Sequence, residues 1–241
     1  MDNTLLLGLQ TQRVLQRRMD VAANNLANIS TAGFKADAVV FEEADGTGAH
    51  STDNPSDIRY VRDIGLLRDM AQGPISQTGN PFDVAIEGDG FFEIEGPNGP
   101  LYTRDGAFTL AGDGRLVTHD GHAVLSSGGA PIVLDPQGET PSIGRDGAIR
   151  VAGVEAGRIG VASFAAPGAL QKVGDNLWSA QGQTPGEFSG VVVQGAIEGS
   201  NVRPVLELTR LIEISRAYQS AAKLVSNTDE LRQRAIQQLG H

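Results

Sequence analysis

The sequence has no cysteine, a single tryptophan and no long apolar run. The absence of cysteine excludes disulfide bonds, thiolate metal sites and thiol redox catalysis. A membrane-spanning helix needs about 20 consecutive, mostly apolar residues, so we expect no membrane insertion. Leu5–Leu7 is followed closely by Arg13, Arg17 and Arg18, which does not fit the apolar core of a cleaved signal peptide. We therefore expect any export to use a route without a cleaved signal.

Basic residues are scarce in the middle of the chain, where acidic residues dominate. The net charge is −10 over 241 residues. Residues 1–35 carry four basic and two acidic side chains and residues 201–241 carry six and four, so each end is +2 and the residues between are −14. A nucleic-acid surface needs clustered Lys and Arg with interleaved aromatics, so no nucleic-acid partner is expected. With 40% hydrophobic residues, the chain can bury a core in one large domain or two ordinary ones.

Apolar residues at heptad spacing predict an amphipathic helix near each end of the chain. Capping residues precede the first periodic leucine, so a helix is expected from about residue 4 to about residue 28, before Gly33. A second helix is expected from about residue 201 to about residue 239, because Pro204 is tolerated in a first helical turn. The apolar stripes contain Leu5, Leu15, Met19, Ala22 and Leu26 in the first helix, and Leu208, Leu211, Ile214, Tyr218, Ala221 and Val225 in the second.

Neither stripe can be buried by its own helix, so the two helices are expected to pack on each other and on copies of themselves. The asparagines at positions 24, 25 and 28 are weak helix formers at the end of the first helix. Spacing alone leaves two interpretations open for them, a fraying helix end with polar side chains or a shared interface motif.

The middle of the chain predicts β-structure, which makes the fold class α+β. Residues 36–80 have turn compositions and short apolar pieces, and are expected to form an extended and looped connector. From Phe82 onwards the apolar residues alternate, and five Asp-Gly pairs favour two-residue hairpin turns with positive φ at both central positions. We expect an all-β sandwich or open barrel over residues 81–165 and a small β and loop return segment over residues 166–199. Residues 1–35 and 200–241 would form one discontinuous helical domain.

Patterns that could carry chemistry are weak. His119-Asp120-Gly121-His122 resembles a metal site, but the other histidines, His50 and His241, form no partner cluster, so a polar hairpin turn explains it better. No stretch has the spacing of an EF-hand, a nucleophile elbow or a catalytic triad. We therefore expect no catalytic residue, no cofactor and no metal. A carboxylate pair that cleaves glycans stays open as an alternative for the acidic middle.

Several segments resemble the axial proteins of the bacterial flagellum, the family of rod, hook and hook-filament junction proteins. Residues 23–28 with Thr31 and residues 33–35 are similar to the N-terminal signature of that family. The middle is similar to its rod and hook subgroup at residues 79–92 and 102–108. Near the C-terminus, residues 195–201, 204–208 and 215–220 are most similar to its proximal-rod branch, with a distal-rod or hook-type protein as the alternative.

The resemblance implies a structural protein of the basal-body rod in the periplasmic space, not an enzyme. The terminal helices would form an inner coiled-coil layer of a helical tube and the β-domain its outer wall. The partners would be other copies, neighbouring proximal- and distal-rod proteins and the flagellar type III export apparatus. A general binding module or adhesin is the third hypothesis. The expected assembly interface consists of Leu5, Leu15, Met19, Ala22, Asn24, Asn25, Leu26, Asn28, Phe34, Leu208, Leu211, Ile214, Tyr218, Ala221 and Val225.

Overall fold

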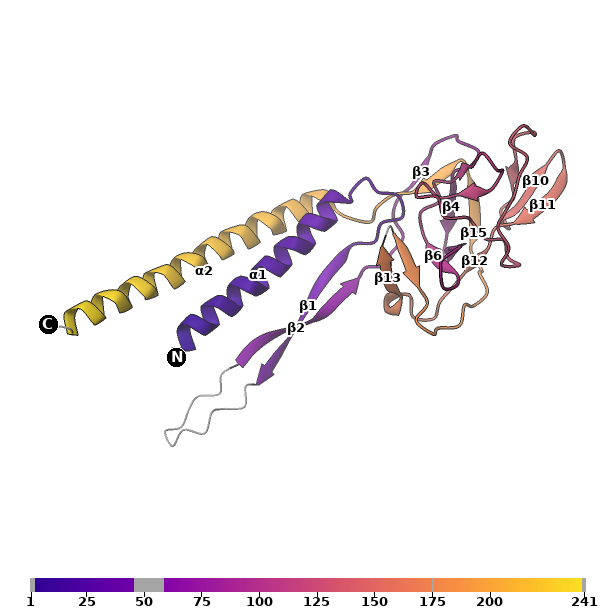
Figure 1. The fold of residues 1–241 in the computed structure, drawn as a ribbon. Coiled ribbons are helices and arrows are strands. Elements are labelled where there is room, and N and C mark those ends of the chain that lie inside the picture. The colour runs from indigo at the N-terminus through magenta and orange to yellow at the C-terminus, as the bar shows by residue number, and fades with distance from the viewer. Residues whose placement is uncertain (1–2, 46–58, 175, 240–241) are drawn as a thin grey trace. The chain divides into compact units, whose positions relative to one another are not determined.

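The structure is a computed structural model that describes residues 3–45, 59–174 and 176–239. It contains two long helices and many antiparallel strands, which confirms the α+β class with a β-rich middle (Figure 1). The chain divides into two compact units. Unit 1 comprises Met1–Ala27, Asp37–Arg68 and Arg203–His241, and unit 2 comprises Asn28–Ala36 and Asp69–Val202.

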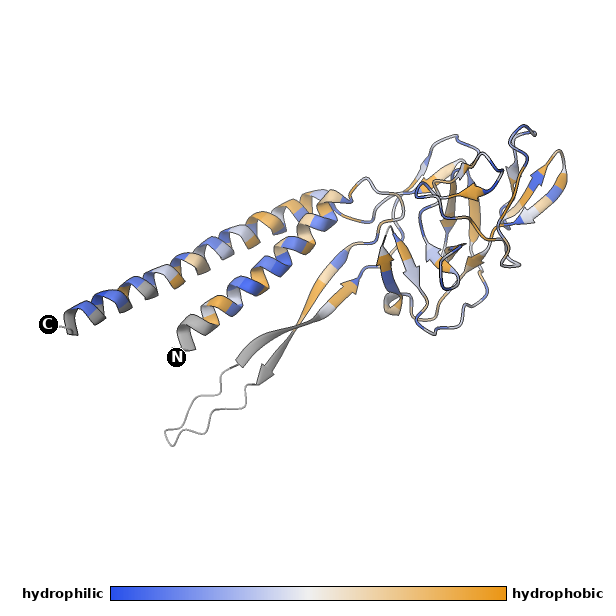
Figure 2. Ribbon diagram, in the orientation of Figure 1, coloured by the Kyte–Doolittle hydropathy of each residue, from blue (hydrophilic) through white to orange (hydrophobic). Residues whose placement is uncertain are grey.

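Unit 1 contains both helices, α1 (Asn3–Ala27) and α2 (Pro204–Leu239), close to the predicted bounds. Polar and apolar residues alternate along both helices, as an amphipathic pattern requires (Figure 2). Leu15, Ala22 and Ile214 are buried together where α1 packs on α2. Half-buried residues complete this contact, namely Met19, Leu211, Tyr218 and Ala221. None of the described helices is long and apolar enough to cross a membrane.

Unit 1 also contains an antiparallel strand pair that the sequence analysis did not predict. Strands β1 (Asp37–Asp45) and β2 (Arg59–Arg68) pair from Asp37 opposite Arg68 to Asp45 opposite Arg59, with a bulge at Val40/Phe41. An ion pair of 3.3 Å between Arg68 Nε and Asp37 Oδ1 closes one end. The extended pieces were predicted, but nothing local in sequence shows which of them pair. The loops predicted within residues 46–58 lie outside the described residues.

Unit 2 consists of short strands in several small antiparallel sheets. The largest sheet has the order β12-β5-β6-β14-β13, the next has the order β11-β10-β9, and β15 pairs with β4, β16 with β3 and β7 with β8. The strands are β3 (Ile75–Gln77), β4 (Val84–Glu87), β5 (Phe91–Ile94), β6 (Leu101–Thr103), β7 (Thr109–Leu110), β8 (Leu116–Val117), β9 (Ser142–Ile143), β10 (Ala148–Val151), β11 (Val154–Arg158), β12 (Val161–Ala162), β13 (Gln171–Gly174), β14 (Leu177–Ser179), β15 (Val191–Gln194) and β16 (Ala196–Glu198). A short 3-10 turn lies at Pro167–Ala169.

The five-stranded sheet separates two apolar clusters because successive side chains on a strand point to opposite faces. On β5, Phe92 joins the larger cluster, whereas Phe91 joins the smaller one. On β14, Leu177 joins the larger cluster and Trp178 the smaller one. The predicted alternation of buried and exposed residues fails in β4. Val84, Ala85 and Ile86 are all buried, because both faces of this strand are covered.

The Asp-Gly turns differ from the prediction in one respect. Gly114, Gly121 and Gly147 have positive φ values of 86°, 87° and 78°, but no aspartate among the described residues has a positive φ. Each glycine N–H bonds the carbonyl three residues earlier, as in Gly114 to Ala111 at 2.9 Å. The expected two-residue turns are therefore wrong, and the geometry is that of a type I turn followed by a left-handed glycine. The two-histidine motif, with Gly121, is one of these turns.

Candidate assembly site

The predicted interface residues separate into buried and exposed groups. Leu15, Ala22 and Ile214 are buried within the α1–α2 contact, and Leu26 and Val225 are half-buried. Gly8 provides space beside Val225, since a Cβ at Gly8 would lie 2.6 Å from Val225 Cγ2. Most of the heptad stripe is thus used to pair the two helices of a single chain. Leu5 lies in α1, but its side chain is outside the described part of the structure.

The three asparagines have different surroundings. Asn25 is buried, and its amide binds both the carbonyl oxygen and the N–H of Asp37, at 2.8 Å and 3.0 Å. Its Nδ2 also lies 3.5 Å from Glu207 Oε2, so it connects α1 with β1 and α2. Asn24 is exposed, and Asn28 accepts a 3.1 Å hydrogen bond from Thr31 Oγ1. Asn25 therefore has a role inside the chain that a fraying helix end does not explain.

A second apolar stripe on α2 is exposed. Val205, Leu208 and Ile212 follow an i, i+3, i+7 spacing and are exposed by 78%, 45% and 50%. The sequence analysis counted Leu208 in the apolar stripe of the second helix and gave Val205 no role, although the same spacing is present in the sequence. Further exposed apolar side chains on the two helices are Leu7, Leu9, Leu206, Leu224 and Leu231.

Phe34 lies in unit 2 beside a buried cluster of charges. Its side chain is 2% exposed, and Lys172 Nζ lies 4.7 Å from the centre of its ring. Next to it in sequence, Lys35 donates from Nζ to Glu198 Oε1 at 2.7 Å and to the carbonyl of Ala71 at 2.8 Å. The sequence analysis named Lys35 only as part of the family signature and gave it no role.

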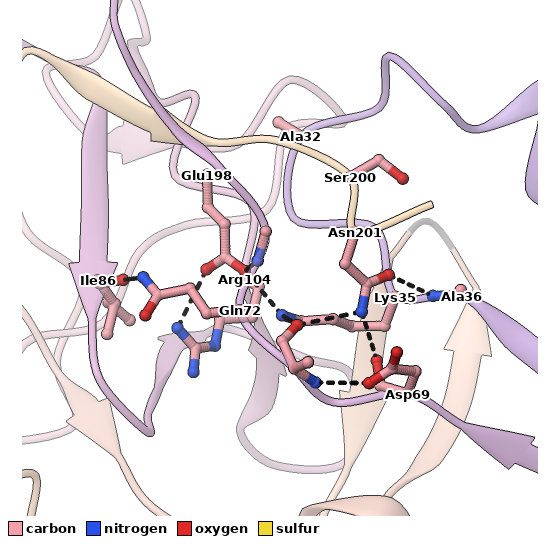
Figure 3. A network of polar contacts seen from close by, with 12 residues as sticks. Ala32, Lys35, Ala36, Asp69, Gln72, Ile86, Arg104, Glu198, Ser200 and Asn201 are labelled. Atoms are coloured by element: carbon pink, nitrogen blue, oxygen red, sulfur yellow. Dashed lines mark hydrogen bonds and ion pairs between the residues drawn. The ribbon is translucent and has the colours of Figure 1, made fainter. Parts of the chain in front are cut away.

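Arg104 contributes the second cation of this cluster (Figure 3). Its Nη1 lies 3.1 Å from Glu198 Oε2, and its Nη2 donates to the carbonyl of Gly88 at 2.7 Å. Lys35 and Glu198 are each 1% exposed and Arg104 is 3% exposed. Burial lowers the pKa of the Lys35 amino group and the pKa of Arg104, and the charge of Glu198 opposes both shifts. Glu198 therefore supplies the counter-charge that keeps two cations inside unit 2.

Asp105 is a half-buried carboxylate next to Arg104 in sequence. Burial raises the pKa of its carboxyl group, the N–H of Ala107 opposes that shift, and the nearby charge of Asp120 adds to it. The pKa in the folded protein is thus above its unfolded value. The folded state then binds more protons, so stability is lost as the pH rises from about 4 through the folded pKa.

We expect Asp105→Asn to stabilise unit 2 at pH 7.5 by on the order of 1 kcal/mol. The asparagine oxygen can still accept the N–H of Ala107 at this position, whereas the charge is removed. Urea unfolding of both proteins should show little difference at pH 4 and an increasing advantage of the variant towards pH 7.5. A difference that does not depend on pH would contradict this explanation.

Comparisons with known proteins decide what kind of protein this is. Three family models match, described as "Flagella basal body rod protein" at residues 5–35, "Flagellar hook protein FlgE/F/G D1 domain" at residues 85–151 and "Flagellar basal body rod FlgEFG protein C-terminal" at residues 193–238. The flagellar basal-body rod proteins FlgF of Caulobacter vibrioides and of Mesorhizobium japonicum are each 40% identical, over 100% of this chain and 99% of theirs. The chain belongs to the flagellar basal-body rod proteins.

Within this family the chain is similar to FlgF over its full length, and the rod protein FlgG of Bacillus subtilis is 33% identical over 97% of both chains. The rod protein is therefore a structural subunit of the flagellar basal body, which confirms the resemblance seen in the sequence. These families are structural and not enzymatic, so the glycan-cleaving alternative is withdrawn. Among the described residues, no group of His, Cys, Asp and Glu side chains could hold a metal ion.

Proposed function

We propose that the rod protein is a subunit of the proximal rod that assembles through its terminal helices. Copies of this chain and neighbouring proximal- and distal-rod proteins would be its partners. The helices would form an inner coiled-coil layer, with the β-rich unit, as a sandwich or open barrel, in the outer wall. The type III export apparatus would deliver the chain to the periplasmic space without a cleaved signal peptide.

The observation that carries this proposal is the exposed stripe of Val205, Leu208 and Ile212 on α2. Burying one such side chain contributes about 1.5–3 kcal/mol, so covering the stripe with a helix of another subunit would stabilise the assembly. A head-to-tail contact that does not close on itself produces a helical tube, whereas a symmetric contact would stop at a dimer. The stripe and the heptad residues would therefore have different roles. The buried and half-buried heptad residues pair the helices of one chain, and the exposed stripe, which includes Leu208, meets the next subunit.

Sparse burial in unit 1 supports a dependence on assembly. Ordering one residue costs about 1–2 kcal/mol in backbone entropy, which burial must offset. Among residues of unit 1 whose side chains are described, the buried ones are Leu15, Val21, Ala22, Asn25, Glu207 and Ile214. We propose that both helices become fully ordered only when subunits join. Terminal amides that resist hydrogen exchange in a dilute, isolated protomer would contradict this part of the proposal.

Leu208→Glu tests the exposed stripe. Because Leu208 is already 45% exposed, we expect the unfolding midpoint of the purified protein to stay unchanged. Loss of its burial between subunits should reduce incorporation into isolated basal bodies at least about tenfold and should reduce swarming. The control is Glu213→Gln, an exposed position on another face of α2, which should incorporate normally. Normal incorporation of the Leu208 variant would remove this face from the assembly surface.

A further inference from the structure

Three charged residues that are far apart in sequence meet inside unit 2. Lys35 and Glu198 are 163 positions apart, and Arg104 and Glu198 are 94 apart. All three lie in segments that resemble the family signatures, where an exposed assembly contact would be the simplest expectation. Their exposure of 1–3% excludes direct contact with a neighbouring subunit in this conformation. Their role is therefore internal to unit 2.

The cluster lies where the chain enters and leaves unit 2, at residues 33–36, 69–74 and 198–201 (Figure 3). Glu198 accepts the N–H of Gly73 on Oε1 at 2.9 Å, and its backbone carbonyl accepts the N–H of Gly33 at 2.8 Å. Asn201 adds hydrogen bonds from its Nδ2 to the carbonyls of Asp69 and Ala71, at 2.7 Å and 3.0 Å. These three segments are thus held side by side around one carboxylate.

The charges around this carboxylate do not cancel by local pairing. Two cations face Glu198, while Asp69 acts on Lys35 and Asp89 acts on Arg104. Both aspartates are exposed, so their charges are screened by water more than the charge of Glu198. Removing one partner from a buried ion pair is far more costly than replacing the whole pair by apolar groups. Neutralising Glu198 alone would leave two buried cations without a buried counter-charge.

We propose that Glu198 is an electrostatic latch that holds together the entry and exit segments of unit 2. Its carboxylate pairs both cations, and without its charge these segments separate while the apolar core of unit 2 stays folded. The latch would fix the points at which the chain passes between the two units. This role does not depend on the proposed assembly surface, because all the groups involved belong to one chain and one unit.

Hydrogen exchange in the full-length Glu198→Gln variant tests the latch. The amides of Gly33 and Gly199, which donate to backbone carbonyls, report its opening. The amides of Val124 and Ile132 report the core, where they donate to Leu116 and Val124. We expect the Gly33 and Gly199 amides to exchange at least about a hundredfold faster than in the wild type, and the core amides to accelerate less than about tenfold. Glu187→Gln makes the same change at an exposed position and should alter neither pair.

Equal acceleration of all four amides would show that Glu198 stabilises unit 2 as a whole and would overturn the latch. Unchanged exchange of the Gly33 and Gly199 amides would overturn it as well. The double variant Lys35→Met/Glu198→Gln provides a second test, which separates charge pairing by Glu198 from a purely steric role of its side chain. It contains one unpaired buried cation in place of two, so its Gly33 amide should be protected at least about tenfold better than in Glu198→Gln. Weaker protection than in the single variant would contradict charge pairing.

Discussion

Replacing Gly106 with alanine is expected to unfold unit 2 under conditions in which the wild type is stable. A Cβ at this position would collide with the carbonyl oxygen of Val84 and would lie 3.0 Å from Cε2 of Phe92. Val84 and Phe92 are completely buried, and the Gly106 carbonyl accepts the N–H of Val84 at 2.9 Å. The backbone at Gly106 therefore has no room to move away. Overpacking of this kind should cost about 3 kcal/mol or more.

The single tryptophan makes this measurement direct. Trp178 is 1% exposed within unit 2, so its fluorescence should follow the unfolding of that unit in urea. Gly112→Ala is the matched control, because no atom would lie within 4 Å of a Cβ there and φ is not positive. Its midpoint should equal that of the wild type. Equal midpoints for the Gly106 and Gly112 variants would disprove the steric explanation.

The second large effect is expected from Ile214→Asp. Ile214 is 5% exposed and packs with Leu15 and Ala22 in an apolar cluster between α1 and α2. A carboxylate placed in this apolar cluster, added to the lost apolar contact, should weaken helix pairing by about 3 kcal/mol. We expect α1 and α2 to separate, rod incorporation to fail and motility to be lost. Leu26→Asp should act in the same direction but less strongly, because Leu26 is only half-buried.

Unit 2 should be unaffected by Ile214→Asp, which separates this result from general misfolding. The Trp178 unfolding midpoint should stay at the wild-type value, while helical circular dichroism of the isolated protein or incorporation into basal bodies decreases. Ile214→Val is the control and should cost only about 0.5–1.5 kcal/mol. Wild-type motility in both aspartate variants would mean that the α1–α2 contact is not needed in the rod.

The sequence predicted the helices well because their signals are local. Heptad spacing, a capping sequence and Pro204 defined α1 and α2 to within a few residues. The same spacing could not show which stripe faces the partner helix of the same chain and which stays exposed. That distinction separates Ile214 from Leu208, and it depends on the orientation of two helices that are remote in sequence.

The β-rich unit was predicted in kind but less well in detail. Glycines were expected to serve turns with positive φ, which is correct at Gly114 but not at Gly106, where φ is ordinary and the constraint is close packing. The pairing of Lys35 and Arg104 with Glu198 has no local signal at all. A lysine or an arginine on a polar stretch is usually solvated, and only the folded chain shows that these two are buried.

The position of Glu198 has a consequence for how the polypeptide is made. A ribosome, or a channel that receives the N-terminus first, releases Lys35 and Arg104 long before Glu198, which follows them by 163 and 94 positions. Strands β15 and β16, the partners of β4 and β3, emerge equally late. From the addition of Arg104 until that of Glu198, the nascent chain therefore contains two cations whose burial lacks a counter-charge and is costly. The order of the sequence thus favours a polypeptide that stays unfolded, and able to pass through a narrow channel, until the last fifth of its residues has been added.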